Sequence, residues 1–160
     1  MRDDGAIEEL NRLAFGPARF TRAAHLIREE GGHDRALSFV ARLGGKAVGT
    51  VRMTPIVIGD ENGYLLGPIV VSADLKSLGL GAHLMGLAIN AAKAGAAPII
   101  VLVGDEPYYR RFGFKKVAEG DMKMPAPVNP ARLLALELVD GALERAKGEV
   151  RHKNLSKRQA

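Results

Sequence analysis

Cysteine is absent from the 160-residue sequence. Its absence excludes disulfide bonds, a thiol nucleophile and a thiolate metal site. Four histidines are present, but their positions show no spacing typical of metal ligands, so we expect no bound metal. Aromatic residues make up only 5% of the chain, and the core must therefore consist mostly of Leu, Val, Ile and Ala.

Long apolar segments are also absent. No apolar run approaches the roughly 20 residues that a membrane-spanning helix needs. The first ten residues, MRDDGAIEEL, lack the apolar segment of a secretory signal. Together with the lack of cysteine, these features predict a cytoplasmic protein that has no membrane partner.

Positive charge is in excess, with a net charge of +5, and much of the excess lies in the C-terminal segment RHKNLSKR. The length suits one folded unit, so we predict a single domain over residues 1–150 and a basic tail over residues 151–160. A basic tail can contact nucleic acid. Because no stripe of arginines and aromatic residues supports that role, we favour a solvated terminus and expect no nucleic-acid partner.

The N-terminal half has the pattern of two helices followed by an antiparallel meander. Apolar residues at helical spacing predict helices over residues 6–15 and 19–30. Strand patterns cover residues 36–43, 46–58 and 64–71. Turns are expected at residues 44–45 and 60–63. Gly49 and Pro55 predict irregular points, such as bulges, within the second strand.

The C-terminal half changes to a strand–helix–strand pattern. A helix is expected over residues 81–95, and residues 98–103 are continuously apolar, as in a strand buried on both faces. A crossover of this length predicts that strands 64–71 and 98–103 are parallel. The remaining predicted elements are a short helix over 105–112 ended by Gly113, and strands over 114–117 and 132–139. Residues 140–150 are ambiguous.

The turn before the long helix has the spacing Lys76-x-x-Gly79-x-Gly81. Glycines at a helix N-terminus let a phosphate approach the backbone N–H groups, and Lys76 can add a positive charge. The alternative is a strand-to-helix turn that only requires a positive φ. The spacing matches neither a Walker A loop nor a dinucleotide-binding fingerprint.

Two further features lie on either side of this turn. Pro68 interrupts a strand that should pair with residues 98–103. Either the strand contains an ordinary bulge at this point, or it is splayed and leaves the backbone groups of residues 69–71 available to a ligand. Tyr108 and Tyr109 follow a buried strand. They serve either in packing or, through a hydroxyl at the end of a cleft, as a proton donor to a leaving thiolate.

These three features in this order resemble a GNAT-superfamily acyl-CoA N-acyltransferase. The segments that match are Leu66–Val71, the turn from Lys76 to Ala82, and Gly104–Phe114. The last of these is similar to a Gly-Asp-x-x-Tyr-Tyr-x-Arg-Phe-Gly-Phe signature of a bacterial stand-alone branch. The resemblance covers roughly residues 6–150. It implies a mixed α/β fold with a mainly antiparallel twisted sheet, one splayed parallel strand pair and flanking helices.

The resemblance also implies a co-substrate, acetyl-CoA, and a site for it. Tyr109 would be the general acid that protonates the departing sulfur. The cofactor-binding residues would pair with the pantetheine arm or surround the pyrophosphate; they are Ile69, Val71, Lys76, Leu78, Gly79, Gly81 and Ala82. The chain departs from the family pattern at Lys76, where Gln or Arg is usual, and at Leu78, which is often polar. Residues 1–5 are too few and too polar for the strand that usually precedes the first helix, so that strand is either missing or truncated.

The function expected from this resemblance is transfer of an acetyl group from acetyl-CoA to a primary amine by direct attack. The acceptor, a small molecule or a peptide, is left open, as is a homodimer. Glu61, Asp105 and Glu106 are weak candidates for a general base. The alternatives are a non-catalytic acyl-CoA-binding or regulatory module on the same fold, and a nucleotide-binding domain.

Overall fold

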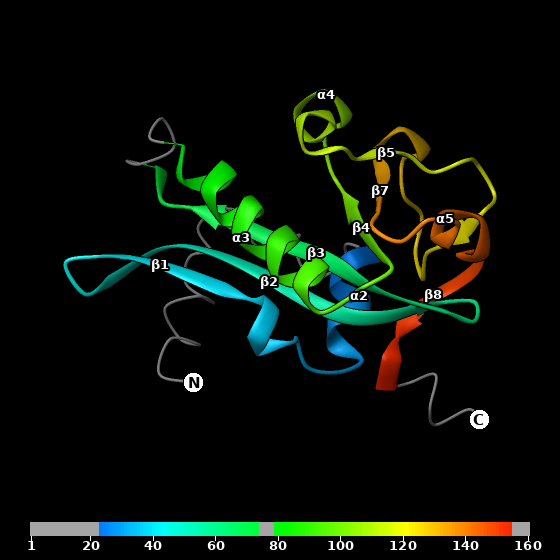
Figure 1. The fold of residues 1–160 in the computed structure, drawn as a ribbon, viewed down its shortest axis with the longest axis horizontal. Coiled ribbons are helices and arrows are strands. Elements are labelled where there is room, and N and C mark those ends of the chain that lie inside the picture. The colour runs from blue at the N-terminus through cyan, green and yellow to red at the C-terminus, as the bar shows by residue number, and fades with distance from the viewer. Residues whose placement is uncertain (1–22, 74–78, 155–160) are drawn as a thin grey trace.

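The computed structural model describes residues 23–73 and 79–154, which form a twisted sheet with flanking helices (Figure 1). The strand order is β5-β7-β4-β3-β2-β8-β6, and β1 also pairs with β2. Among the described strands, the pairs β3–β4 and β6–β8 are parallel and the others antiparallel. The mixed, mainly antiparallel α/β class expected from the sequence is confirmed.

The strands are β1 (Phe39–Leu43), β2 (Lys46–Ile58), β3 (Glu61–Val71), β4 (Ile99–Val103), β5 (Lys115–Lys116), β6 (Met122–Lys123), β7 (Leu133–Glu137) and β8 (Gly148–His152). The α-helices are α2 (Ala23–Glu29), α3 (Leu80–Ala94), α4 (Glu106–Tyr109) and α5 (Ala142–Arg145). Short 3-10 turns are η2 (Arg35–Leu37), η4 (Arg110–Phe112) and η5 (Pro130–Arg132). The helix expected over residues 6–15 lies outside the described residues.

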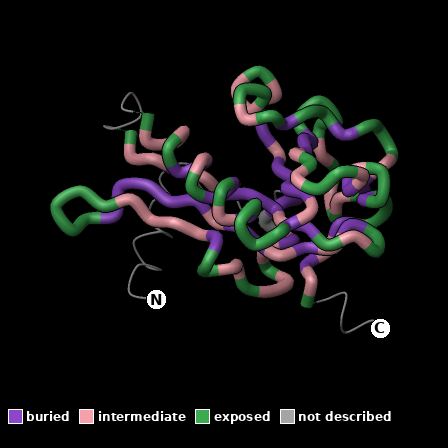
Figure 2. Tube along the Cα trace, viewed as in Figure 1, coloured by how far each residue is buried: buried purple, intermediate pink, exposed green. Residues whose placement is uncertain are grey.

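The strand expected to begin at residue 36 begins at Phe39 instead. Residues 35–37 form η2 because the Asp34 side chain accepts a hydrogen bond from the N–H of Ala36 at 2.9 Å. The hairpin between β1 and β2 matches the prediction, since Gly44 and Gly45 both have positive φ, at 59° and 83°. Its tip extends away from the body of the molecule (Figure 2).

The turn between β2 and β3 lies at residues 59–60 rather than 60–63, so β3 begins at Glu61, three residues before the expected start at residue 64. The strand therefore includes Gly63, which the sequence assigned to the turn. Here glycine serves packing: a Cβ at Gly63 would lie 2.8 Å from Cγ2 of Ile99 on the neighbouring strand β4. The close approach of β3 and β4 at this point requires a residue without a side chain.

Of the two irregular points expected in β2, one is found. The β1–β2 register shifts between Ala41 and Arg42, opposite the stretch that contains Gly49. Pro55 instead pairs in register with Tyr64. Backbone groups of Met53 face Asp34 and Ser38, so those of Pro55 face the same edge, where the neighbour of β2 changes from β1 to β8. The missing N–H of proline is tolerated there without a bulge.

The sheet carries a hydrophobic core on each face, and buried residues concentrate along its central strands (Figure 2). One core joins Ile27 of α2 to Ile56 and Ile58 of β2. The other joins Leu84 and Met85 of α3 to alternate residues of β2, β3 and β4. Helices α2 and α3 therefore cover opposite faces of the sheet. An opening between the strands would have α2 on one side and α3 on the other.

The ambiguous C-terminal segment contains α5 and β8. Strand β8 pairs with β2, and Val150 and His152 are buried. The His152 ring is held between the carbonyl of Gly32, at 2.8 Å from Nε2, and the N–H of Asn154, at 3.0 Å from Nδ1. The expected boundary at residue 150 therefore falls inside a strand, and residues 151–152 belong to the sheet rather than to a tail. In the described ranges, no helix is both long and apolar enough to cross a membrane.

Candidate active site

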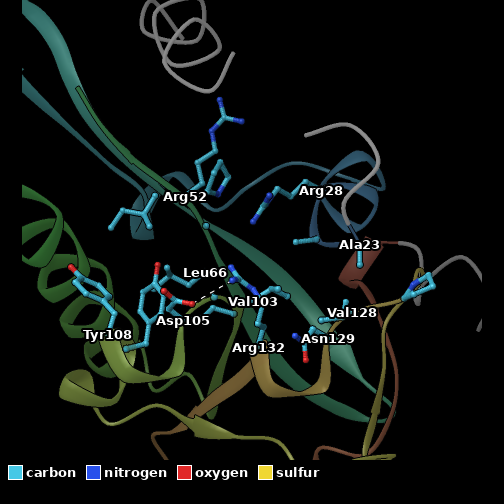
Figure 3. A pocket seen from close by; sticks show the side chains of 18 of the residues that line it. Ala23, Arg28, Arg52, Leu66, Val103, Asp105, Tyr108, Val128, Asn129 and Arg132 are labelled. Atoms are coloured by element: carbon cyan, nitrogen blue, oxygen red, sulfur yellow. Dashed lines mark hydrogen bonds and ion pairs between the residues drawn. The ribbon is translucent and has the colours of Figure 1, made fainter. Parts of the chain in front are cut away.

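A cavity of about 850 Å³ lies where β3 and β4 separate (Figure 3). Only two residue pairs, Tyr64–Ile100 and Leu65–Val101, join these parallel strands. Beyond them the cavity is lined by residues 66–69 of β3 and 102–104 at the end of β4, together with residues of α2, β2, α4 and the loop before β7. A cavity of this size can hold part of an extended ligand.

The separation begins at a bulge in β3. The register between β2 and β3 shifts between Val51 and Met53, which accommodates the extra residue of the Gly67-Pro68 segment on β3. The bulge that Pro68 suggested is therefore present, and the strand is also splayed from its parallel partner at this point.

Backbone groups of Ile69 and Val71 face the opening. The N–H of Ser72 donates to the carbonyl of Val48 on β2 at 2.7 Å. Because successive residues of a strand direct their N–H and C=O groups to alternate edges, Val71 and Ile69 direct theirs away from β2. The two residues predicted to pair with a pantetheine arm thus present their hydrogen-bonding groups along the gap.

The N-terminus of α3 lies beside the same gap. Gly79 caps it in the left-handed region with φ 74°, and the N–H of His83 makes the first intrahelical bond, to the Gly79 carbonyl. The N–H groups of residues 80–82 therefore have no partner within the helix. A Cβ at Gly81 would lie 3.7 Å from Val71 and 3.8 Å from the Tyr108 hydroxyl.

The predicted cofactor residues are thus close together where they can be described. Gly81 contacts the region of Val71, Ala82 occupies the first turn of α3, and Ile69 lines the cavity. Lys76 and Leu78, the positions at which the chain departs from the family pattern, lie outside the described residues.

Tyr109 lines the cavity from α4. Its ring is packed edge-on against Tyr108 and Phe114, with centroids 4.9 and 6.2 Å away. Burial raises the pKa of the Tyr109 hydroxyl above its ordinary value of 10.0, and Tyr108 and Asp105 raise it further, while Arg132 opposes them. The hydroxyl therefore keeps its proton at neutral pH and can donate it.

Gly104 sets the position of the Tyr109 ring. A Cβ at Gly104 would lie 2.4 Å from Cε2 of Tyr109. The helix that carries the tyrosine begins at once, and the N–H groups of Tyr108 and Tyr109 both donate to the Asp105 carbonyl. The spacing from Gly104 to Tyr109 therefore has a steric cause: the tyrosine folds back over its own preceding strand end.

Charged residues line the rest of the cavity, and the sequence did not identify most of them. They are Arg28 and Glu29 of α2, Arg52 of β2, Asp105 before α4, and Arg132 before β7 (Figure 3). Arg132 and Asp105 form an ion pair at 3.4 Å. These residues come from four distant segments, so no local motif could have indicated them.

The three candidates for a general base are not equivalent. Glu61 pairs with Arg145 at 2.7 Å in the β2–β3 hairpin region, and Glu106 pairs with Arg110 at 3.5 Å on α4. Only Asp105 of the three lines the cavity. Glu29 also lines it and was not considered from the sequence. The described residues contain no group of three His, Asp or Glu side chains that could hold a metal ion.

The family of this chain follows from a match to the model described as the Acetyltransferase (GNAT) family, over residues 5–114. The chain belongs to the GNAT acetyltransferase family. The resemblance carried by the proline, glycine and tyrosine motifs is thereby confirmed. An Escherichia coli K12 relative, the uncharacterized N-acetyltransferase YjhQ, is 31% identical over 132 residues, which cover 78% of this chain and 71% of YjhQ.

Solved structures of GNAT proteins share the fold. YhbS from Escherichia coli, solved with CoA, has a TM-score of 0.79 at 24% identity, and the alignment covers 100% of this chain and 89% of YhbS. A GNAT acetyltransferase from Brucella melitensis, solved with acetyl-CoA, has a TM-score of 0.67 at 24% identity, covering 94% of this chain and 90% of the other. These likenesses establish the GNAT fold for the chain.

Proposed function

We propose that the chain is an N-acetyltransferase that transfers the acetyl group of acetyl-CoA to a primary amine. The observation that carries this proposal is the opening between β3 and β4, which has unpaired strand backbone along one side, a helix N-terminus near one end and a buried tyrosine hydroxyl at its wall. The complexes of YhbS with CoA and of the Brucella melitensis protein with acetyl-CoA support the choice of co-substrate.

The backbone of β3 and the start of α3 fit acetyl-CoA. N–H groups of residues 80–82 suit the pyrophosphate, because a helix N-terminus binds anions. Backbone groups of Ile69 and Val71 can pair with the two amides of a pantetheine arm as a neighbouring strand would. Bound acetyl-CoA supplies the thioester carbonyl that the amine attacks.

Two groups of the chain then assist the reaction. The N–H of Ile69 faces the gap and can donate to negative charge that develops on an acyl oxygen there. Tyr109 holds a proton on its hydroxyl for the departing sulfur, so that the carbon–nitrogen bond forms as the carbon–sulfur bond breaks. The amine loses one proton to solvent or to a cavity carboxylate such as Asp105 before it attacks, and the second proton, lost after the carbon–nitrogen bond forms, restores the Tyr109 hydroxyl through solvent.

A turnover assay tests this function against a non-catalytic acyl-CoA-binding module. Free CoA released from acetyl-CoA is measured with a thiol reagent, and the absence of cysteine from the chain removes any background from the protein. We expect amine-dependent release of CoA and a mass increase of one acetyl group on the amine. Binding of acetyl-CoA without release by any amine would support the binding module. A melting temperature raised by ATP but not by CoA would contradict both.

A further inference from the structure

Among the described residues that line the cavity, more side chains are cationic than anionic. Arg28, Arg52 and Arg132 face two carboxylates, Glu29 and Asp105. Asp105 and Arg132 form an ion pair with each other near α4. At the other end of the cavity the described charged side chains are those of Arg28, Glu29 and Arg52.

Arg52 lies on the face of the sheet that α2 covers. Its neighbours Val51 and Met53 belong to the core beneath α3, and side chains alternate along a strand. Arg52 therefore points to the opposite face, the one on which Ile56 packs near α2. The N-terminus of α3 contacts Val71, whose side chain packs against the α3 core, so the proposed pyrophosphate site is on the other face.

The Nε atom of Arg52 is buried and has no hydrogen-bond partner in the described ranges, 23–73 and 79–154. An N–H of a guanidinium that is removed from water without an acceptor is unfavourable. Carboxylate and phosphate oxygens are the acceptors that arginine binds most strongly, often with two parallel hydrogen bonds. Arg52 also lines the cavity, so its guanidinium is a candidate for binding a carboxylate or phosphate of a ligand there.

Arg28 approaches the same place from α2. Its Nη2 atom lies 2.9 Å from the position that a Cβ would occupy at Gly67, so glycine in the bulge of β3 leaves room for the guanidinium. Figure 3 shows Arg28 and Arg52 on the same side of the cavity, extending from α2 and from β2. The Arg28 guanidinium thus lies at the bulge, and Arg52 is the β2 residue opposite it.

Building on the proposed function, we infer that the acceptor is a primary amine that also carries an anionic group, a carboxylate or a phosphate, bound by Arg52 and Arg28. The anionic group would anchor the acceptor on the α2 face while its amine reaches through the gap towards the thioester. The arginines would thereby select the acceptor without taking part in cofactor binding.

Matched pairs of amines test the acceptor class in the CoA-release assay. The panel contains the natural amino acids with their carboxamides, and O-phosphoethanolamine with ethanolamine. We expect an anionic member to exceed its neutral partner in kcat/KM by about 10- to 100-fold, the range typical of hydrogen bonds to charged groups. The pair that responds identifies carboxylate or phosphate. Equal or better use of the neutral members would overturn the inference and leave the proposed function standing.

The variant Arg52→Gln connects the preference to the structure. We expect KM for the anionic acceptor to rise about tenfold or more, with KM for acetyl-CoA and the melting temperature unchanged. Lys46→Gln is the matched control: it removes one positive charge from the exposed end of the same strand, outside the cavity. A rise in KM for acetyl-CoA in Arg52→Gln would overturn the inference, because Arg52 would then serve the cofactor.

Calorimetry keeps the inference testable if no amine is acetylated. The CoA-loaded protein is titrated with inorganic phosphate, O-phosphoethanolamine and glycine. Binding of an anionic probe that Arg52→Gln abolishes and Lys46→Gln retains would support the anion site, although the proposed function had failed. Absence of binding by every anionic probe at millimolar concentration would overturn the inference, whatever the result of the turnover assay.

Discussion

The two ends of the proposed active site are built in different ways. The end proposed for acetyl-CoA consists mainly of backbone: N–H groups at the start of α3 and strand edges at residues 69–71. The end proposed for the acceptor consists of side chains, with arginines from α2 and β2. The first end therefore depends on where the chain turns and bulges, and the second depends on which residues occupy single positions.

This difference suits an enzyme that uses one co-substrate with a variable acceptor. Backbone groups are present whatever the side chains are, so a backbone site tolerates sequence change as long as the glycines and the proline maintain the path of the chain. A side-chain site changes its specificity with one substitution. Substitutions at the two ends should therefore separate cofactor binding, chemistry and acceptor selection.

Removal of the proton donor should have the largest effect. In Tyr109→Phe the ring keeps its packing against Tyr108 and Phe114 but loses the hydroxyl. We expect kcat to fall by roughly 100-fold, with KM for acetyl-CoA unchanged, because the loss affects only the transition state. Tyr64→Phe is the control, since its hydroxyl bonds Asp34 at 3.1 Å outside the cavity. A kcat within threefold of the wild type, about 0.65 kcal/mol in the barrier, would remove Tyr109 from the mechanism.

Displacement of the same ring should have the next largest effect. In Gly104→Ala the new methyl group would meet the Tyr109 ring at 2.4 Å, so the ring must move. We expect kcat to fall about 30-fold, because a displacement near 1 Å can cost up to 100-fold. Gly86→Ala, within α3 and with open space around its Cβ, should leave kcat unchanged and stabilise the fold by about 0.5–1 kcal/mol. Equal kcat in both variants would show that the ring position is unimportant.

The cofactor end could be predicted from the sequence because its determinants are local. Pro68 indicated the interrupted strand, Gly79 and Gly81 the open helix start, and the Gly104–Phe114 motif the tyrosine. The parallel pairing followed from the length of the crossover. The proline and glycine features result from the conformational limits of one or two residues, which are the same in any fold.

The acceptor end and the last strand could not be predicted, because their roles arise only in the folded chain. Arg52 looks like any solvent-facing residue of a strand until β3 splays beside it. Strand β8 has one strongly apolar residue, Val150, and its other buried residue is a histidine satisfied by Gly32 and Asn154. Pairing with β2, almost a hundred residues earlier, makes it a strand. Its local sequence pattern does not favour a strand over a loop.

A charge at the start of α3 should have a moderate effect limited to the cofactor. In Ala82→Asp the carboxylate would lie in the first turn, where it repels a pyrophosphate but interacts favourably with the helix dipole. We expect the Kd of acetyl-CoA to rise about tenfold, or 1.4 kcal/mol, while the free protein becomes no less stable. Ala82→Asn is the uncharged control. If the Kd of acetyl-CoA were unchanged and the KM of the acceptor rose instead, the start of α3 would bind the acceptor rather than acetyl-CoA.

The smallest effect is expected from a change in pH, and Arg132 influences the pH at which it appears. Burial raises the pKa of Tyr109 above 10.0, so its hydroxyl is mainly protonated below pH 10, and the midpoint of a fall in kcat caused by its ionisation should lie above that value. Arg132, from the loop before β7, opposes this shift. Arg132→Gln should therefore move the fall in kcat to still higher pH, as measured by kcat profiles alongside tyrosinate absorbance. A fall that moves to lower pH in this variant would mean that the arginine does not act on the tyrosine through its charge.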